Sequence, residues 1–213
     1  MPPAPLRLLG RRDAFNVRKV LWMLEELGEP FTQEDWGRGH RSMQVPEFLA
    51  LNPLGTVPVL VDGAAVLRES HVIMRYLATT RGRHDLLPAD PAARAEVEAW
   101  MDWVAYEMTL PMRLGYLGGV LNLAPWNGPG MAALGRAEYA VRMGVLEQAL
   151  ARGGPYLAGA TLTLADMACG MAVHRWAVVK KDGSEAPTPA LEAWLERLAE
   201  RPGFRAHIRN GLP

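Results

Sequence analysis

A proline-containing turn runs directly into an apolar segment between Asn52 and Gly63. Because proline has no main-chain N–H, Pro58 is expected to open a strand at its first residue rather than to lie within it. A cis Val57–Pro58 bond costs only about 0.5–1 kcal/mol, and it would turn the polar main-chain groups of Val57 outward. An extended peptide could then pair with these groups as an added strand, which is the chemistry that this stretch indicates.

The elements that must position this stretch follow from the spacing of apolar residues around it. A helical pattern begins at Val17 and ends before Gly28, and Ser70 is placed to cap a later helix. The expected elements are a strand over Leu6–Leu9, a helix from Val17, a strand over Phe31–Trp36, helical turns over Val45–Leu51, a hairpin of Val57–Val61 and Ala65–Leu67, and a helix from Ser70. This order, β-α-β followed by β-β-α, is the thioredoxin-like one.

Strand patterns are absent beyond the charged segment Arg81–Asp85, where we place a domain boundary. Apolar residues recur at helical spacing from Val97 to Met108, and Pro111 is expected to kink or end that helix. Thr163, with Asp166 three residues later, is typical of a capping box. Further helices are expected over Met131–Ala151 and Leu191–Leu198, so the second half of the chain is predicted to be all helical.

Composition narrows the classes of function that remain. The 213 residues are 49% hydrophobic, which is enough for a packed core, and 23 Lys and Arg balance 23 Asp and Glu. A neutral chain has no basic field to attract nucleic acid or an anionic membrane, and no apolar run approaches the ~18 residues of a membrane span. The single cysteine, Cys169, excludes an intramolecular disulfide and suits a reducing compartment. We therefore expect a cytoplasmic protein.

Several segments together resemble the cytosolic glutathione S-transferase superfamily, in the order in which that superfamily has them. They include Gly55–Leu60 with Glu69–Ser70, the helical pattern from Asn16 to Gly28, Pro46–Pro53, and the pattern Thr161–Asp166. The resemblance implies the glutathione S-transferase fold, with an α/β thioredoxin-like domain over residues 1–82, a linker over 83–88 and an all-α domain over 89–213. It also implies glutathione as co-substrate, no metal, and a homodimer.

The resemblance also implies which residues hold glutathione. The main chain of Val57, ahead of Pro58, pairs with the tripeptide, and Glu69 with Ser70 holds its γ-glutamyl end. Ser70 would offer its hydroxyl and its N–H at a helix N-terminus, where an anion is stabilised, and it can be a plain N-cap as well. His40 and Arg41 lie in the loop where the family often places cations for the glycyl carboxylate, although an exposed His-Arg pair is often only solvated.

The sequence departs from the bacterial transferases that it resembles at the position where a serine usually stands. That position is Ala14, followed by Phe15, and alanine cannot donate a hydrogen bond to sulfur. We expect Asn16 to replace the serine, with help from main-chain amides at the positive end of the first helix. The alternative is that Asn16 is only the N-cap of that helix. Asp13 would oppose a thiolate unless Arg11, Arg12 or Arg18 offsets its charge.

An acceptor pocket is expected between the two domains, walled by Phe15 and by the long helix that follows the boundary. Aromatic and apolar residues suit a hydrophobic electrophile, although such a stripe is also typical of a core or a dimer interface. The residues concerned are Phe15, Trp103, Tyr106, Leu110 and Arg113. His71 and His174 stand alone in helices and receive no metal role, and Cys169 is expected to be buried and inert.

The function that these features predict is conjugation of the glutathione thiolate to a hydrophobic electrophile. Two alternatives remain. One is a different glutathione-dependent reaction on the same scaffold, namely dehalogenation, isomerisation or peroxide reduction. The other is a non-catalytic or weakly active protein that binds glutathione or another ligand. Fold alone does not distinguish these functions.

Overall fold

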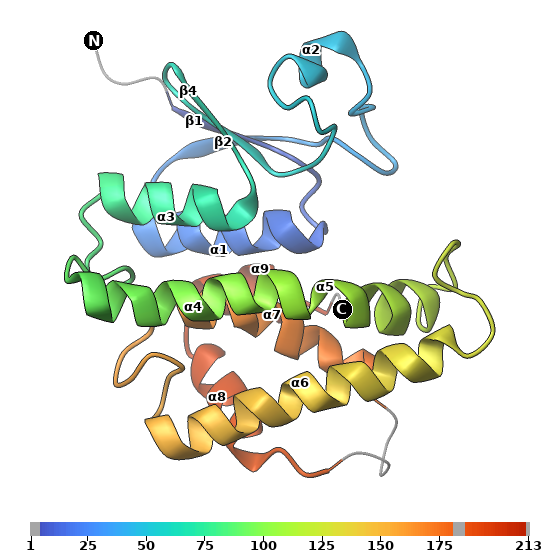
Figure 1. Ribbon diagram of the computed structural model, residues 1–213. Coiled ribbons are helices and arrows are strands. Elements are labelled where there is room, and N and C mark those ends of the chain that lie inside the picture. The colour runs from blue at the N-terminus through green and yellow to red at the C-terminus, as the bar shows by residue number, and fades with distance from the viewer. Residues whose placement is uncertain (1–4, 181–185, 212–213) are drawn as a thin grey trace. The chain divides into compact units, whose positions relative to one another are not determined.

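The computed structural model describes residues 5–180 and 186–211 (Figure 1). These residues form two compact units. The first unit is the part of the chain up to Arg83 together with the segment that begins at Pro202, and the second is His84–Arg201. The sequence pattern assigns all of residues 89–213 to one helical domain, whereas in the structure the C-terminal segment groups with the first unit.

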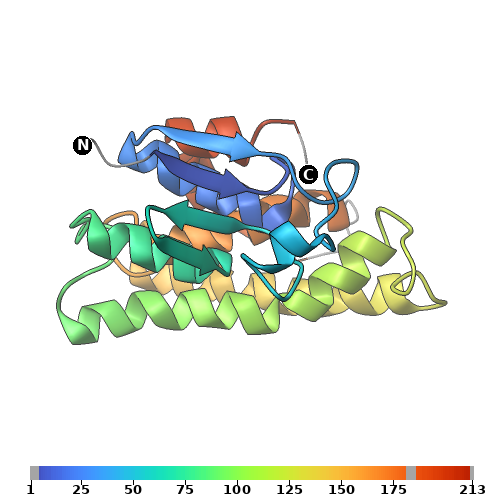
Figure 2. The same ribbon diagram turned by 90° about the horizontal axis from the view of Figure 1, so that it is seen from above.

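The first unit contains a four-stranded sheet in the order β2-β1-β3-β4 (Figure 2). The strands are β1 (Leu6–Leu9), β2 (Phe31–Glu34), β3 (Val59–Asp62) and β4 (Ala65–Arg68). β1 pairs with β2 in parallel and with β3 in antiparallel orientation, and β3 and β4 form an antiparallel hairpin. The predicted hairpin and the predicted first strand are thus confirmed, although β3 begins at Val59, just after Pro58.

Two helices, α1 (Phe15–Leu27) and α3 (Ser70–Thr80), lie on one face of this sheet (Figure 1). A short helix, α2 (Pro46–Leu49), leads into the turn before β3. Leu8, Leu9 and Leu60 of the strands are completely buried, as are Ile73 and Leu77 of α3. Because α1 also buries every residue from Val17 to Leu24, its position is fixed by packing on several sides.

The second unit is built from helices, as predicted. They are α4 (Pro91–Glu107), α5 (Thr109–Met112), the π-helix η1 (Arg113–Gly118), α6 (Met131–Gly153), α7 (Leu164–Val179) and α8 (Pro189–Leu198). The interruption between α4 and η1 surrounds Pro111, which confirms the expected break there. Gly115 and Gly135 let η1 approach α6 closely, because a Cβ on Gly135 would lie 2.3 Å from the main-chain N of Gly115.

Asp166 organises the start of α7. The predicted capping box is present, since Thr163 and Asp166 bond reciprocally. The fully buried Asp166 carboxylate also accepts hydrogen bonds from the Leu157 N–H (2.9 Å) and the Trp194 indole N–H (2.9 Å). Burial raises the pKa of Asp166, and these hydrogen bonds oppose that effect. One carboxylate therefore joins α7, α8 and the loop before α7.

A buried cation joins the two ends of the first unit. Arg18 of α1 is fully buried, and its guanidinium donates to the carbonyl oxygens of His207 (2.7 Å) and Ile208 (2.5 Å) and to Oδ1 of Asn210 (3.1 Å). The two carbonyls lie at the C-terminal end of α9 (Pro202–His207), where a positive charge is favoured. Trp22 of α1 packs edge-on against Phe204, with ring centroids 5.1 Å apart. We call this arrangement the C-terminal clasp.

Substitution of Arg18 by methionine should destabilise the protein strongly. The change removes the charge-assisted hydrogen bonds to His207, Ile208 and Asn210 and leaves buried carbonyls without a donor, so we expect the free energy of unfolding to fall by at least about 3 kcal/mol. Urea denaturation measures the loss. Arg12→Met is the matched control, because Arg12 is exposed and its replacement should cost less than about 0.5 kcal/mol. Equal losses in the two variants would contradict the role given to Arg18.

Candidate functional site

The helix α1 begins without a side-chain cap. Its N-cap residue is Ala14, whose methyl group cannot accept a hydrogen bond, and Asn16 is the second helical residue. The alternative in which Asn16 is the N-cap is therefore wrong. Asn16 is exposed, and within the described part of the chain neither its amide nor its main-chain N–H has a hydrogen-bond partner. The positive end of this helix thus presents free donors.

The charge just ahead of α1 is balanced locally. Asp13 forms an ion pair with Arg11, with Nη1 and Oδ1 2.6 Å apart. Arg18 donates instead to the carbonyl oxygens of His207 and Ile208 in the C-terminal clasp. Of the three arginines considered from sequence, Arg11 is therefore the one that directly offsets the carboxylate of Asp13.

Gly10 brings the turn that carries Val57 against the first turn of α1. Its φ is 144°, and a Cβ at this position would lie 2.5 Å from Cγ2 of Val17 and 3.0 Å from Cβ of Val57. Only glycine fits between two side chains at such distances without moving them. Val57 therefore lies next to the start of α1, although the two are separated by about forty residues in the chain.

The main chain of Val57 is available for pairing. Among the residues that the structure describes, its N–H and C=O have no hydrogen-bond partner. Its side chain packs against the cluster of Leu9, Trp36, Phe48 and Val59, so the residue is held while its polar main-chain groups stay open. The Val57–Pro58 bond is cis, which confirms that expectation.

A buried amide shapes the turn that leads to Val57. Asn52 is fully buried; its Nδ2 donates to the carbonyl (2.8 Å) and the hydroxyl (3.1 Å) of Thr56, and its Oδ1 accepts from the N–H of Leu54 (3.1 Å). Gly55, at a φ of 60°, closes the turn through its N–H to the carbonyl of Asn52. The Asn52 side chain therefore supplies hydrogen-bond partners to the main chain of this turn and fixes its conformation.

Glu69 and Ser70 stand at the start of α3, but their capping roles differ from the prediction. Glu69 is the N-cap and Ser70 is the first helical residue, so the interpretation of Ser70 as a plain N-cap is wrong. Glu69 has a φ of 68°, which is costly for a residue with a side chain and is typical of functional sites. The start of α3 has no side-chain cap, and the Ser70 hydroxyl bonds to no described residue. The start of α3 therefore also has hydrogen-bond donors without a protein partner among the described residues.

A buried polar contact joins the starts of α1 and α3. Nζ of Lys19 lies 2.9 Å from Nε2 of His71, and Lys19 is only 3% exposed. The same ammonium lies 5.0 Å from the centre of the Phe15 ring. These contacts link Phe15, one turn before Lys19, with the residue after Ser70. The two helix N-termini consequently lie at the same end of the unit (Figure 1).

Arg41 is engaged by carboxylates of the protein itself. Its guanidinium lies 3.7 Å from the Trp36 ring centre and forms ion pairs with Glu34 (3.5 Å) and Glu47 (3.2 Å). Burial raises the pKa of Glu34, but hydrogen bonds from Arg7 and Trp36 and nearby positive charges outweigh it and lower the pKa. His40 is exposed. No described hydrogen bond or ion pair links His40 or Arg41 to Val57 or Ser70.

The residues predicted to contact an acceptor from the second unit lie along α4, α5 and η1. Trp103 is half-buried and packs edge-on against Trp100, whereas Tyr106 is 82% and Leu110 55% exposed. Arg113 is exposed as well, and its guanidinium lies 5.1 Å from the Trp126 ring. Tyr106, Leu110 and Arg113 are therefore accessible on the unit to which they belong.

Other reactive groups are accounted for. Within the two described ranges there is no group of three or more His, Cys, Asp or Glu residues placed to bind a metal. Cys169 is buried in α7, with its Sγ 3.8 Å from the carbonyl of Trp100. No helix of the described residues is both long and apolar enough to span a bilayer.

The structure therefore brings most of the predicted first-unit residues to one end of that unit: Ala14, Phe15, Asn16, Val57, Pro58, Glu69 and Ser70. It adds Asn52, Lys19 and His71, whose roles the sequence did not indicate. An Asn immediately before Pro53 at a turn is a weak signal for Asn52, whereas nothing in the sequence marks the Lys19–His71 contact.

The fold and the site together indicate the class of protein to which this chain belongs. A thioredoxin-like sheet with two uncapped helix N-termini and an open main-chain segment before β3, followed by a helical unit, is suited to hold a small peptide. Comparison with known proteins specifies the family.

Residues 16–80 match the model of the N-terminal domain of glutathione S-transferases, and residues 143–197 match that of their C-terminal domain. The chain is 34% identical over 204 residues to glutathione S-transferase GstB of Escherichia coli strain K12, covering 94% of this chain and 96% of that protein. It is 35% identical over 216 residues to glutathione S-transferase 3 of Zea mays, covering 96% and 94% of the two chains.

Among solved structures, the theta class glutathione S-transferase of Xanthomonas axonopodis pv. citri with glutathione bound superimposes with a TM-score of 0.89. The identity is 33%, over 99% of this chain and all of that one. The chain belongs to the glutathione S-transferase family.

Replacement of Asn52 by alanine should loosen the turn before β3. The change leaves the buried Thr56 carbonyl and Leu54 N–H without partners, so we expect the free energy of unfolding to fall by about 1–3 kcal/mol. Chemical denaturation measures it. Asn16→Ala is the matched control, since Asn16 is exposed and makes no hydrogen bond to described residues. An Asn52→Ala protein as stable as the control would contradict the role of Asn52.

Proposed function

We propose that this protein conjugates the thiolate of glutathione to a small hydrophobic electrophile. The observation that carries the proposal is the open main chain of Val57, held beside the uncapped start of α1. Glutathione is an extended tripeptide with a thiol between two carboxylate-bearing ends. It can pair through its own main chain at Val57, and the uncapped start of α1 beside Val57 is the proposed partner of its sulfur.

The start of α3 is the proposed anchor for the γ-glutamyl end. The Ser70 hydroxyl and N–H are open to a carboxylate, and the helix end adds a favourable partial charge. Glu69 can receive the amino group, and its main chain is held at a strained φ of 68°. His40 is kept as a second contact, whereas Arg41 would have to exchange Glu34 and Glu47 for the glycyl carboxylate.

The start of α1 is the proposed site of thiolate stabilisation. Ala14 supplies no hydroxyl, so the donors are the exposed amide of Asn16 and the main-chain N–H groups of the first turn. Arg11 offsets the charge of Asp13, which would otherwise oppose a thiolate. Phe15 lies at the same turn and is the proposed contact for the acceptor.

Phe15 is the proposed acceptor contact of the first unit, and Trp103, Tyr106, Leu110 and Arg113 are the residues of the second unit proposed for the same role. Tyr106 is 82% and Leu110 55% exposed, so both are accessible to a ligand, which supports this role. A second candidate function is glutathione or ligand binding without efficient turnover, which the missing hydroxyl at Ala14 favours. Dehalogenation, isomerisation and peroxide reduction by glutathione remain the narrower alternatives.

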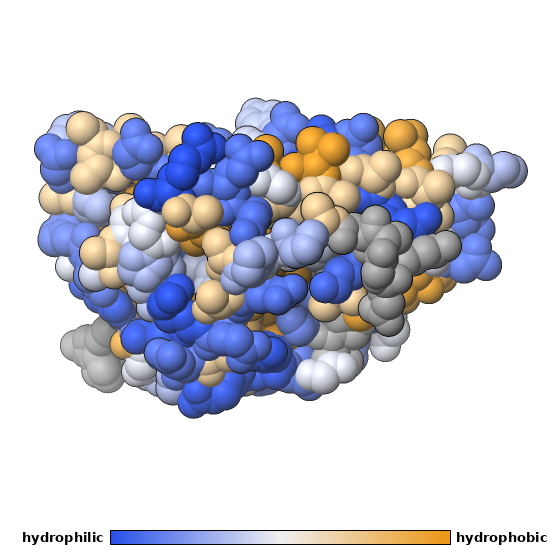
Figure 3. Space-filling model, turned by 90° about the horizontal axis from the view of Figure 1, so that it is seen from below, coloured by the Kyte–Doolittle hydropathy of each residue, from blue (hydrophilic) through white to orange (hydrophobic). Residues whose placement is uncertain are grey.

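A homodimer in the cytoplasm completes the proposal. Several large apolar side chains of the second unit are exposed, among them Leu134, Val141 and Val145 on α6. Figure 3 shows that hydrophobic residues gather toward one part of the face seen from below, while most of that face is hydrophilic. A second copy of the chain could cover such a surface.

The dimer is tested by placing a charge on α6. Wild-type protein should sediment at twice the chain mass of 23.4 kDa. Val141, which is 62% exposed, becomes buried in a dimer, so Val141→Glu should shift the protein toward monomer. Ala151→Glu, at an exposed position on another side of the same helix, is the control and should stay dimeric. A monomeric wild-type protein would overturn this part of the proposal.

The thiolate donor is tested by exchanging residues at positions 14 and 16. Asn16→Ala should lower kcat/KM with a reactive aryl halide by about tenfold to a hundredfold, because a hydrogen bond to a charged group is lost. Ala14→Ser should raise it by a smaller factor. The pH profile of kcat/KM should move to higher pH in Asn16→Ala, since the pKa of the bound thiol rises.

Each other outcome has a definite meaning. Equal activity of wild type and Asn16→Ala would remove Asn16 from the mechanism, and a large gain in Ala14→Ser would mark position 14 as the vacated donor. Retention on immobilised glutathione with no turnover by any variant would favour the binding protein. Failure to bind glutathione at all, with the fold intact, would overturn the proposal.

A further inference from the structure

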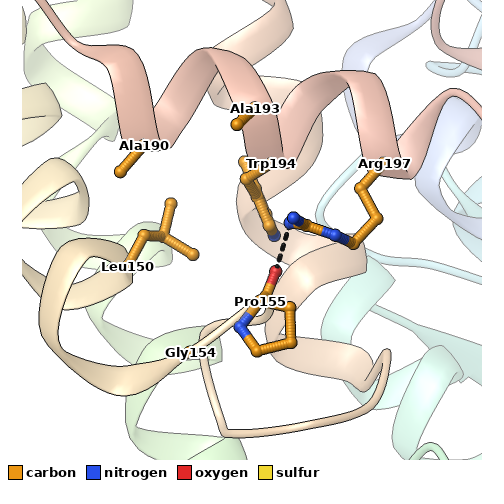
Figure 4. Close-up of a pocket in the computed structure, with 7 residues that line it drawn as sticks. All are labelled: Leu150, Gly154, Pro155, Ala190, Ala193, Trp194 and Arg197. Atoms are coloured by element: carbon orange, nitrogen blue, oxygen red, sulfur yellow. Dashed lines mark hydrogen bonds between the residues drawn. The ribbon is translucent and has the colours of Figure 1, made fainter.

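The hollow between the end of α6 and α8, about 230 Å³ in volume, is lined by side chains that the second unit uses for its own packing (Figure 4). Trp194 is fully buried and donates to Asp166, and Nη1 of Arg197 donates to the carbonyl oxygen of Pro155 (2.8 Å). We assign no ligand to this hollow. The loop before α2 in the first unit differs, because it carries an exposed polar side chain beside the proposed glutathione site.

This side chain, Gln44, lies across the turn that leads to Val57. A Cβ on Gly55 would lie 2.5 Å from Nε2, 3.4 Å from Cδ and 3.6 Å from Oε1 of Gln44, so the whole amide group packs against this glycine. Gly55 is buried and Gln44 is exposed, which means that the amide covers the glycine from the solvent side. Because Gly55 is two residues before Val57, the amide lies at the edge of the segment proposed to pair with glutathione.

The main chain of Gln44 is fixed, while its amide group is available to a ligand. Its N–H donates to Oγ of Ser42 (3.2 Å), and the next residue, Val45, packs against the same apolar cluster as Val57. The side-chain amide makes no hydrogen bond to any residue that the structure describes. Its NH2 group can therefore donate to a ligand that lies along Val57.

The order of the strands places Gln44 and Ser70 on opposite sides of Val57. In the sheet order β2-β1-β3-β4, the loop with Gln44 follows β2 at one edge, Ser70 follows β4 at the other edge, and Val57 leads into β3 (Figure 2). A tripeptide that pairs with Val57 and has its γ-glutamyl end at Ser70 therefore directs its C-terminal residue toward the loop of Gln44. This step rests on the proposed function.

The cations of the same loop are not held against this turn. Arg41 is paired with two carboxylates of the protein itself. The side chains of Arg38 and His40 are exposed and have no hydrogen bond or ion pair to a described residue. The polar group that the structure holds against the turn is therefore the uncharged amide of Gln44.

We propose that Gln44 determines which thiol peptides this protein accepts, by binding their C-terminal group through a neutral amide. The NH2 group can donate to a carboxylate and equally to the carbonyl oxygen of an ester or an amide. A neutral donor gains less from a negative charge than a guanidinium or an ammonium does. The protein therefore accepts γ-glutamylcysteinyl peptides with an uncharged C-terminal group about as well as glutathione, and its selectivity lies at the γ-glutamyl end.

Calorimetric titration of the full-length protein with glutathione and with its glycyl ethyl ester tests the proposal. The two Kd values should agree within about fivefold, since the ester keeps the carbonyl acceptor and loses only the charge. A larger difference in favour of glutathione would show that a cation recognises the carboxylate, and it would overturn the proposal.

The variant Gln44→Glu distinguishes a direct contact from a structural role. It keeps the shape of the side chain, removes the donor and adds a negative charge. Glutathione binding should weaken about thirtyfold or more, whereas binding of the uncharged ester should weaken only about fivefold. A purely structural role of Gln44 would weaken both ligands by the same factor.

Arg38→Gln is the control, because it removes an exposed cation from the same loop and should leave both Kd values unchanged. Weaker glutathione binding in Arg38→Gln would assign the contact to that cation and overturn the proposal. Equal weakening of the two ligands in Gln44→Glu, or no weakening of either, would overturn the role of Gln44 and leave glutathione binding intact. If the wild-type protein binds neither ligand, the proposed function fails as a whole, and this inference fails with it.

Discussion

The site in the first unit depends on main-chain groups that the fold leaves without partners. Proteins satisfy nearly all of their buried N–H and C=O groups, because an unpaired one costs free energy. Here the partly buried Val57 and the starts of α1 and α3 keep N–H or C=O groups without a protein partner among the described residues. Gly10 and the Lys19–His71 contact bring these segments together. An arrangement with several open donors close together is stable only if the surrounding structure holds it, and it gains free energy when a peptide supplies the missing partners.

The support comes from buried polar side chains whose own groups are satisfied. Arg18 binds the C-terminal segment and fixes α1, while Asn52 fixes the turn before β3. Asp166 does the same in the second unit by accepting from Leu157, Thr163 and Trp194. Removing one partner from such a buried group is costly, so each of these residues resists local motion. The unpaired donors at the site are therefore held in position by buried side chains, such as Arg18 and Asn52, whose hydrogen bonds are made within the protein.

The sequence predicts those parts of the fold that depend on local chemistry. The hairpin at Asp62–Gly63, the capping box of Thr163 and Asp166, and the break at Pro111 each follow from residues that are neighbours in the chain. The clasp could not be predicted, since Arg18 and Ile208 are 190 residues apart and nothing in a six-residue helix marks its partner. The exact caps were also missed, because Ser70 and Asn16 have cap-forming side chains while Glu69 and Ala14 occupy the cap positions. At the starts of α1 and α3, the N-cap preferences of the residue types therefore do not determine which residue is the cap; the main-chain geometry of the site does.

The absence of a hydroxyl at Ala14 does not by itself prevent thiolate formation. A free thiol has a pKa near 8.5, and working mainly as thiolate at neutral pH requires ~1.4–2.7 kcal/mol in favour of the anion. A helix N-terminus contributes ~0.3–1 kcal/mol, and a hydrogen bond to a charged group ~1.5–3 kcal/mol. The uncapped start of α1 and the free amide of Asn16 together reach this range. The ion pair of Asp13 with Arg11 also affects the stability of the thiolate. A carboxylate without a counter-charge just ahead of α1 would offset the stabilisation that the helix N-terminus provides.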